Sequence, residues 1–219
     1  MENSEIKIIN TEDGSQSLYS HKLGETYHSK HGAVQESTHV FIEAGFLRSA
    51  EKKDQIRILE VGFGTGLNAL LTLKKCEEIG KKVDYYGLEP FPLTAELISE
   101  LNYHALDPRF KLLHQAYDSA NKINEFFNLT VMNATIMNVE ISEKFDLIYY
   151  DAFGPPAQPE MWTSEIFAKL YSLLNEDGIL VTYCAKGSVR RSMIEEGFNV
   201  ERLAGPPGKR EMLRATKPM

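Results

Sequence analysis

Three glycines at alternating positions directly follow an apolar, β-type run in this chain of 219 residues. The run 56–61 has the composition of a buried strand, and Glu60 stands within it. Gly62, Gly64 and Gly66 allow backbone conformations that a Cβ atom forbids, so a ligand can approach the main chain closely. Because a helix-like segment follows, the loop opens at a helix N-terminus, whose free N–H groups attract anions. The spacing therefore predicts a loop that binds a nucleotide-type cofactor.

Two further acidic residues follow apolar, strand-like runs. Glu89 follows the run 83–88, and Asp151 follows the run 145–150 and precedes a turn rich in Gly and Pro. Ligands of an open α/β sheet bind beyond the carboxyl ends of its strands, so we expect both acids beside the glycine loop. Glu89 suits hydrogen bonds to ribose hydroxyls. The position of Asp151 favours a chemical role, although an aspartate before Gly and Pro also serves as a simple turn residue.

The elements that must position these residues alternate along the chain. Residues 6–30 are typical of short strands or hairpins, and 33–47 of an amphipathic helix. From residue 56 onwards strands and helices alternate, which predicts a mostly parallel sheet with helices on both faces. The expected strands are 56–61, 83–88, 145–151, 178–184, 198–204 and 210–216, and the third strand is either 110–114 or 129–133.

Composition narrows the class of protein. The hydrophobic content of 42% and charged content of 25% are typical of a soluble globular protein. We expect a cytoplasmic protein without a membrane segment, since Cys76 and Cys184 suit a reducing compartment and no run reaches the ~20 apolar residues of a membrane span. The net charge of −7 argues against a nucleic-acid partner, yet the segment 186–219 carries eight basic and four acidic residues. That segment could form a local docking patch, or simply an ordinary charged surface.

The glycine pattern separates two cofactor classes. A dinucleotide-binding loop has the form GxGxxG, whereas this chain has GxGxG, with Leu67 where the third glycine of that form would stand. Together with Glu60, the arrangement ExGxGxG resembles the first motif of class I S-adenosylmethionine (SAM) methyltransferases. An NAD-dependent oxidoreductase is the disfavoured alternative.

The chain as a whole resembles a narrower family. This family comprises the methyltransferase half of the bacterial bifunctional MnmC-type enzymes, which complete the 5-methylaminomethyl group of the tRNA wobble uridine, and its stand-alone (MnmD-type) members. The matching motifs occur in family order at residues 62–68, 89–94, 151–153, 158–163, 189–191 and 208–213. The resemblance implies a class I SAM methyltransferase Rossmann-like α/β fold. Its mostly parallel seven-stranded sheet has an antiparallel C-terminal strand, and an N-terminal β-hairpin/helix extension (1–54) covers the cofactor site ahead of the methyltransferase domain (55–219).

The resemblance also implies a reaction. It is the SAM-dependent N-methylation of 5-aminomethyl-2-thiouridine to 5-methylaminomethyl-2-thiouridine in the anticodon stem-loop of tRNA. We expect no metal, and the chain has no room for the flavin-dependent domain of the bifunctional enzymes. Asp151 is the expected catalytic residue, because it could orient the amine and take or relay its proton. If solvent takes that proton, Asp151 only positions the amine.

The remaining site residues follow from the same resemblance. Residues expected to bind SAM are Glu60, Gly62, Phe63, Gly64, Thr65, Gly66, Asn68, Glu89, Pro90, Thr135, Asp151 and Ala152. Residues expected to contact the tRNA substrate are Tyr27, Glu36, Phe153, Trp162, Arg190, Arg191, Lys209 and Arg210. The aromatic side chains suit stacking on a splayed-out base and the basic ones suit phosphates. Trp162 equally suits the hydrophobic core.

One departure from the family pattern affects the adenine site. The family usually has an acid after the third strand, where this chain has Thr135. Thr135 or Asn133 could bind the adenine amino group with less charge assistance, and Asp118 is a less favoured substitute. The alternative function is therefore a methyltransferase of the same fold that acts on another RNA or on a small-molecule amine. A non-catalytic binding module is disfavoured because Asp151 is present.

Overall fold

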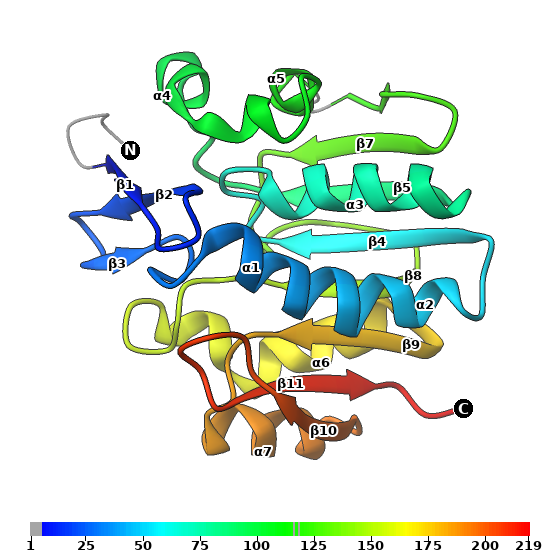
Figure 1. The fold of residues 1–219 in the computed structure, drawn as a ribbon. Coiled ribbons are helices and arrows are strands. Elements are labelled where there is room, and N and C mark those ends of the chain that lie inside the picture. The colour runs from blue at the N-terminus through cyan, green and yellow to red at the C-terminus, as the bar shows by residue number, and fades with distance from the viewer. Residues whose placement is uncertain (1–5, 116, 118) are drawn as a thin grey trace.

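A central sheet with helices on both faces organises the molecule (Figure 1). The computed structural model describes residues 6–115, 117 and 119–219, so Asp118 lies outside the described residues. Within them the sheet has eight strands in the order β10-β11-β9-β8-β4-β5-β7-β6. Their bounds are β4 Gln55–Val61, β5 Lys82–Leu88, β6 Asn121–Lys122, β7 Phe127–Met132, β8 Phe145–Tyr150, β9 Leu174–Thr182, β10 Asn199–Ala204 and β11 Glu211–Thr216.

The pairing of these strands confirms the predicted fold class. Strands β7, β5, β4, β8 and β9 are parallel neighbours, and β11 pairs antiparallel with β9 and with β10. The two-residue strand β6 adds an antiparallel edge beside β7, beyond the seven strands expected.

The ambiguous third strand is β7. Phe127, Leu129 and Val131 are buried at every second position, as a strand requires. The competing segment forms helix α5 (Phe110–Leu113), whose buried residues Phe110 and Leu113 are three positions apart and so share one helix face.

Helices cover the sheet in two layers. One layer holds α3 (Leu67–Ile79) and the N-terminal helix; the other holds α6 (Ser164–Leu173) and α7 (Gly187–Glu195). The N-terminal helix consists of α1 (Ala33–Ser37), the π-helical segment η2 (Thr38–Leu47) and α2 (Arg48–Ala50). Shorter helices are α4 (Ala95–Glu100), η3 (Asn102–Ala105), α5 and η4 (Pro159–Trp162). A separate antiparallel sheet holds β1 (Ile6–Asn10), β2 (Gln16–Ser20) and β3 (Glu25–Thr26).

The alternation of side chains along the central strands creates two hydrophobic clusters. Ile58 of β4 and Tyr149 of β8 belong to the cluster under α3, whereas Leu59 and Tyr150 belong to the cluster under α6 and α7. Strands buried on both faces explain why their sequences read as nearly continuous apolar runs.

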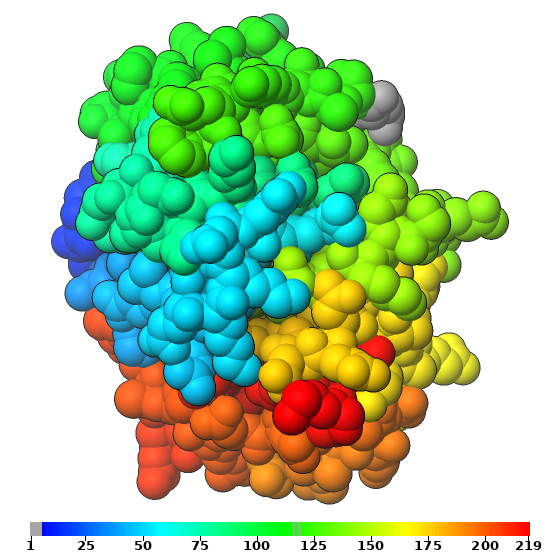
Figure 2. Space-filling view, turned by 90° about the vertical axis from the view of Figure 1, so that its right-hand side faces the viewer, coloured from blue at the N-terminus to red at the C-terminus, as the bar shows by residue number. Residues whose placement is uncertain are grey.

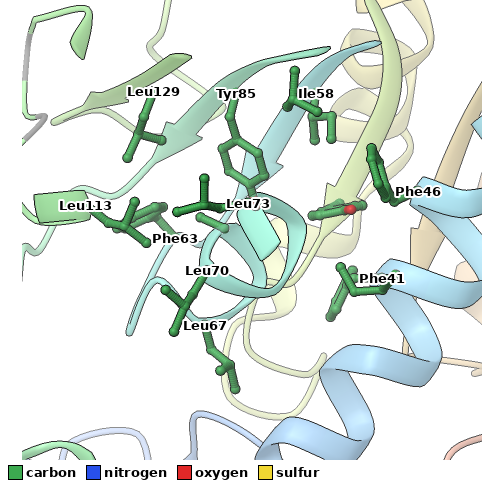
Figure 3. Packing of buried hydrophobic residues seen from close by; sticks show 14 of the residues in the cluster. Phe41, Phe46, Ile58, Phe63, Leu67, Leu70, Leu73, Tyr85, Leu113 and Leu129 are labelled. Atoms are coloured by element: carbon green, nitrogen blue, oxygen red, sulfur yellow. The ribbon is translucent and has the colours of Figure 1, made fainter. Parts of the chain in front are cut away.

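The predicted helix over 33–47 is confirmed and extends to Ala50. Its residues Phe41 and Phe46 are buried in the first cluster, and the Phe41 ring lies 5.1 Å from that of Tyr149, centroid to centroid (Figure 3). The helical part of the N-terminal segment therefore packs directly on the central sheet. The division of the chain at residue 54 stays a prediction.

The last residues of the chain lie at the end of the sheet where β4 and β9 begin, opposite the carboxyl ends of the parallel strands (Figure 1). Figure 2 shows this end of the molecule, where the last residues, in red, lie beside the yellow segment that leads into β9. Lys217 Nζ donates to the carbonyl oxygens of Tyr171 (3.1 Å) and Leu174 (3.0 Å). Among the described residues, no helix has the length and apolar character needed to cross a membrane.

Truncation of Phe46 tests the packing of the N-terminal helix. Phe46→Ala should lower the free energy of unfolding in urea by about 3–5 kcal/mol, because it removes a fully buried ring and leaves a cavity. Ile194→Ala on α7, where the side chain is 43% exposed, should change it by less than about 1 kcal/mol. Equal effects of the two substitutions would contradict this packing.

Candidate active site

A cavity of about 680 Å³ lies at the carboxyl ends of the central strands. It opens between β4 and β8. From β4 the chain adds β5 and β7 on one side of the sheet and then β8 and β9 on the other side. Ligands of open α/β sheets bind at such a switch point. Residues from the β2–β3 turn and from the loop 153–158 form its outer walls.

The glycine loop packs tightly against the end of β8. Gly62 has φ +92°, and a Cβ atom there would lie 2.6 Å from the carbonyl oxygen of Asp151. Only glycine allows this approach, which places the loop and Asp151 side by side. Gly64 lines the cavity, and a Cβ atom on it would lie 3.3 Å from the Tyr27 ring. Gly66 is the N-cap residue of α3 and does not line the cavity.

Glu89 is fixed by backbone amides at the cavity wall. Its Oε2 accepts a hydrogen bond from the Gly64 amide (2.8 Å) and its Oε1 from the Phe91 amide (2.9 Å). Burial raises the pKa of Glu89 to about 7, while the two amides favour its ionised form. The carboxyl group is thus held in one orientation beside the loop, next to Pro90, which also lines the cavity.

Asn68 joins two carboxyl groups from neighbouring strands. Its Nδ2 donates to Glu60 Oε1 (2.8 Å) and to Asp151 Oδ2 (2.9 Å). Tyr85 OH donates to Glu60 Oε2 (2.8 Å). Glu60 is fully buried behind the cavity wall, and burial raises its pKa well above the usual range. Glu60 therefore supports Asn68 from behind, and Asn68 and Asp151 line the cavity.

Asp151 is suited to proton transfer near neutral pH. Burial raises its pKa to about 7, and the nearby carboxylate of Glu36 acts in the same direction. The hydrogen bond from Asn68 and the charge of Lys209 act in the opposite direction. A perturbed carboxyl group in a cleft is a characteristic feature of general bases.

Glu36 and Lys209 form an ion pair in the cavity. Glu36, in the first turn of α1, is buried; its Oε2 accepts from the Ser29 amide (2.7 Å), and its Oε1 accepts from Lys209 Nζ. The Lys209 ammonium lies 3.9 Å from the centre of the Tyr183 ring. Tyr183 OH donates to the carbonyl oxygen of Ala152 (2.9 Å), the residue after Asp151.

The predicted aromatic residues occupy two different places. Tyr27 and Phe153 line the cavity in edge-to-face contact, with ring centroids 4.9 Å apart. Trp162 is buried against Tyr150 and does not line the cavity. Its Nε1 donates to the carbonyl oxygen of Phe153 (2.8 Å), so Trp162 holds the loop that carries Phe153.

Thr135 lines the cavity on the side predicted for adenine. Its hydroxyl donates to Asn138 Oδ1 (2.9 Å) and so also closes a turn. Phe91 (47% exposed) and Met137 (55% exposed) line the same cavity and stand at its surface.

The sequence-predicted residues divide into two groups. Those that line the cavity are Tyr27, Glu36, Gly62, Phe63, Gly64, Thr65, Asn68, Glu89, Pro90, Thr135, Asp151, Ala152, Phe153 and Lys209. Those that do not are Glu60, Gly66, Trp162, Arg190, Arg191 and Arg210. Arg190 and Arg191 lie on α7, and Arg210 is exposed just before β11.

Several cavity residues were missing from the sequence prediction. They include Lys22, Tyr183 and Lys186. His28 was expected at the site together with Tyr27 and Glu36, and it lines the cavity as well. Burial lowers the pKa of His28 to about 4, so its imidazole is neutral at physiological pH. Tyr183 was detectable in principle, because it follows β9 at the same sheet edge as Glu89 and Asp151.

The pH dependence of stability tests the environment of Asp151. Because its pKa is raised on folding, its ionised form destabilises the native state, increasingly from about pH 4 to about pH 7 and constantly above. Asp151→Asn removes this effect, so its stability relative to wild type should increase with pH over that range, as measured by urea unfolding.

Asp54 supplies the control. Its hydrogen bond and charge interaction with Lys81 (2.6 Å) lower its pKa from the usual 3.8. Asp54→Asn should therefore lose stability relative to wild type as pH rises to about 4 and stay level between about pH 4 and about pH 7. A relative stability of Asp151→Asn that falls or stays level with pH would contradict the buried environment.

Comparisons with known proteins identify the family and the fold. A sequence model of the family described as "S-adenosyl-L-methionine-dependent methyltransferase" matches residues 99–218. The crystal structure of MNMC2 from Aquifex aeolicus superimposes with a TM-score of 0.80 at 31% identity, covering 98% of this chain and 71% of that one. Spermidine synthase from Thermotoga maritima (TM-score 0.61, 14% identity, 97% of this chain and 68% of that one) shares the fold.

A curated relative matches most of this chain. The "tRNA 5-methylaminomethyl-2-thiouridine biosynthesis bifunctional protein MnmC" of Pseudomonas aeruginosa strain UCBPP-PA14 is 30% identical over 90% of this chain. The match covers 33% of that protein, so this chain spans about a third of its length. The comparisons confirm the predicted fold and cofactor, and this chain belongs to the family of S-adenosyl-L-methionine-dependent methyltransferases.

Proposed function

We propose that this enzyme methylates the primary amine of 5-aminomethyl-2-thiouridine at the wobble position of tRNA, which yields 5-methylaminomethyl-2-thiouridine. The observation that carries the proposal is the position of Asp151, whose carboxyl group lies in the cavity beside the glycine loop and has a pKa raised to about 7. The similarity to MNMC2 and to the MnmC proteins supports tRNA as the substrate. Its place of action would then be the cytoplasm, where tRNA is modified.

The cavity residues fit SAM. The Gly64 backbone lies open to the cavity, and the fixed carboxyl group of Glu89 suits hydrogen bonds to ribose hydroxyls. Asn68 Oδ1 is buried and has no hydrogen-bond partner among the described residues, so it could accept a bond from a ligand N–H group. When bound, SAM supplies an electrophilic methyl group on a sulfonium. Thr135, with Met137 and Phe91, is the proposed adenine side of the site.

Closing the space at Gly64 tests this assignment. Gly64→Val should abolish SAM binding in calorimetry, because the branched side chain fills the space between the loop and Tyr27. Gly80→Val is the matched control. Gly80 also has positive φ (+67°) and is the C-cap residue of α3, the helix that follows the glycine loop, and a Cβ atom there would have no other atom within 4 Å. Unchanged affinity in Gly64→Val, or equal loss in both variants, would reject the assignment.

Asp151 has a defined task in this reaction. A free alkyl amine has a pKa near that of lysine, about 10.4, and is mostly protonated at neutral pH. The amine must lose a proton before its lone pair can attack, and ionised Asp151 can accept it. Since Asn68 fixes one carboxylate oxygen, the other is available to the amine. The remaining work is alignment of the amine in line with the bond that breaks.

The surroundings of the cavity suit a nucleotide that is turned out of an RNA loop. Tyr27 and Phe153 offer aromatic surfaces for the base. Lys22 and Lys186 stand at the cavity and are exposed, which suits the phosphates of the flanking nucleotides. Lys186 is also the N-cap residue of α7, and Arg190 and Arg191 lie one turn further along this helix. We propose that they contact further phosphates of the same RNA.

One incubation tests the reaction and the substrate together. Labelled SAM and tRNA that lacks the terminal methyl group are incubated with the enzyme, and the tRNA is digested to nucleosides. We expect labelled 5-methylaminomethyl-2-thiouridine with wild type and none with Asp151→Ala, which should still bind SAM.

Arg190→Glu combined with Arg191→Glu should weaken tRNA binding and leave SAM affinity unchanged.

Failure to methylate the tRNA nucleoside would point to a different substrate. If SAM binds and the nucleoside stays unmethylated, tRNA is not the substrate. The alternative is then a methyltransferase for another RNA or for a small-molecule amine. The carboxylates that line the cavity, and the net charge of −7, favour a cationic small amine in that case.

A further inference from the structure

Lys209 occupies an unexpected place for a positive charge. It lines a cavity that is proposed to hold a sulfonium cofactor and an amine, both of which carry positive charge in water. Its sequence position suggested a contact with tRNA phosphates. In the structure its ammonium donates a hydrogen bond to the buried carboxylate of Glu36 and lies against the face of the Tyr183 ring.

The backbone around Lys209 is fixed by a tight turn between β10 and β11. The Lys209 amide donates to the carbonyl oxygen of Pro206 (2.9 Å), and the Gly205 amide donates to that of Arg210 (3.1 Å). Glu36 is fixed as well, because the Ser29 amide holds its second oxygen and its side chain is only 7% exposed. The ion pair of Glu36 and Lys209 is therefore a fixed part of the cavity wall.

Charged and titratable groups from several elements interact electrostatically with Asp151. They are Glu36 on α1, Glu60 on β4, Tyr85 on β5, Tyr183 after β9, and Lys209 before β11. Glu36, Tyr183 and Lys209 line the same cavity, and Glu60 shares the Asn68 amide with Asp151. Glu36 opposes the ionisation of Asp151 and Lys209 favours it. Lys209 is thus the cation in this set, among carboxyl and phenol groups whose ionised forms are negative.

We propose that Lys209, held by Glu36 and Tyr183, is a positioning residue for Asp151. Its ammonium offsets the charge of Glu36, so that the Asp151 carboxylate can exist next to a second buried carboxylate. The part of this inference that concerns catalysis rests on the proposed function, since an ionised Asp151 is what receives the proton of the amine. The effect of Lys209 on the ionisation of Asp151 does not depend on which substrate the enzyme uses.

The titration of Asp151 tests the electrostatic part without cofactor or tRNA. Protein with ¹³C-labelled aspartate carboxyl groups is titrated by NMR, and Asp151→Asn identifies the Asp151 signal. Lys209→Met should raise the pH midpoint of the Asp151 carboxyl titration by about one pH unit. Glu36→Gln should lower this midpoint by a similar amount. Shifts in opposite directions would not result from general structural damage.

Two further variants complete the test. Lys209→Arg keeps the positive charge and should hold the Asp151 midpoint near the wild-type value. Lys217→Met is the matched control, because Lys217 also lies over an aromatic ring, that of Tyr171 at 4.6 Å, but away from the cavity. A midpoint that does not move in Lys209→Met and Glu36→Gln, or that moves equally in Lys217→Met, would overturn the inference.

The catalytic part has its own readout. The acidic limb of the pH profile for methyl transfer to tRNA should shift upwards in Lys209→Met and downwards in Glu36→Gln, in step with the NMR midpoints. If the midpoints move and no variant methylates tRNA, wild type included, the proposed substrate is wrong and the role of Lys209 stands. If wild type methylates tRNA and the midpoints do not move, only the role of Lys209 is wrong.

Discussion

The amide of Asn68 holds the site together, because it bonds carboxyl groups from two neighbouring parallel strands. Glu60 comes from β4 and Asp151 follows β8, and both would be unfavourable in a buried position without donors. Asn68 reaches them from the first turn of α3, so the glycine loop between β4 and α3 must turn sharply. Gly62 makes that turn possible, since a side chain there would collide with the Asp151 carbonyl.

The rest of the cavity is built from segments that are far apart in the sequence. Glu36, in the N-terminal helix, and Lys209, near the C-terminus, meet over the end of the sheet, 173 residues apart along the chain. Because the N-terminal helix packs through Phe41 and Phe46 on the same sheet, its first turn brings Glu36 to the wall of the cavity that Asp151 also lines. The hydrophobic core thereby determines the electrostatics of the site.

The sequence was sufficient for features that depend on local pattern. Apolar runs that end in Glu89 or Asp151, and alternating glycines, are properties of neighbouring residues, and their common sheet edge follows from parallel topology. The choice between 110–114 and 129–133 as third strand needed the burial pattern of the folded chain. The pair of Glu36 and Lys209, and the core position of Trp162, depend on contacts between distant segments that no local pattern encodes.

A crystal structure of the enzyme with bound SAM would be the decisive test of the site. We expect the cofactor to lie along the glycine loop, with its ribose at Glu89 and its reactive methyl group facing Asp151 across a space that fits an amine nitrogen. A methyl group directed away from Asp151, or a cofactor bound outside this cavity, would contradict the proposed roles of these residues.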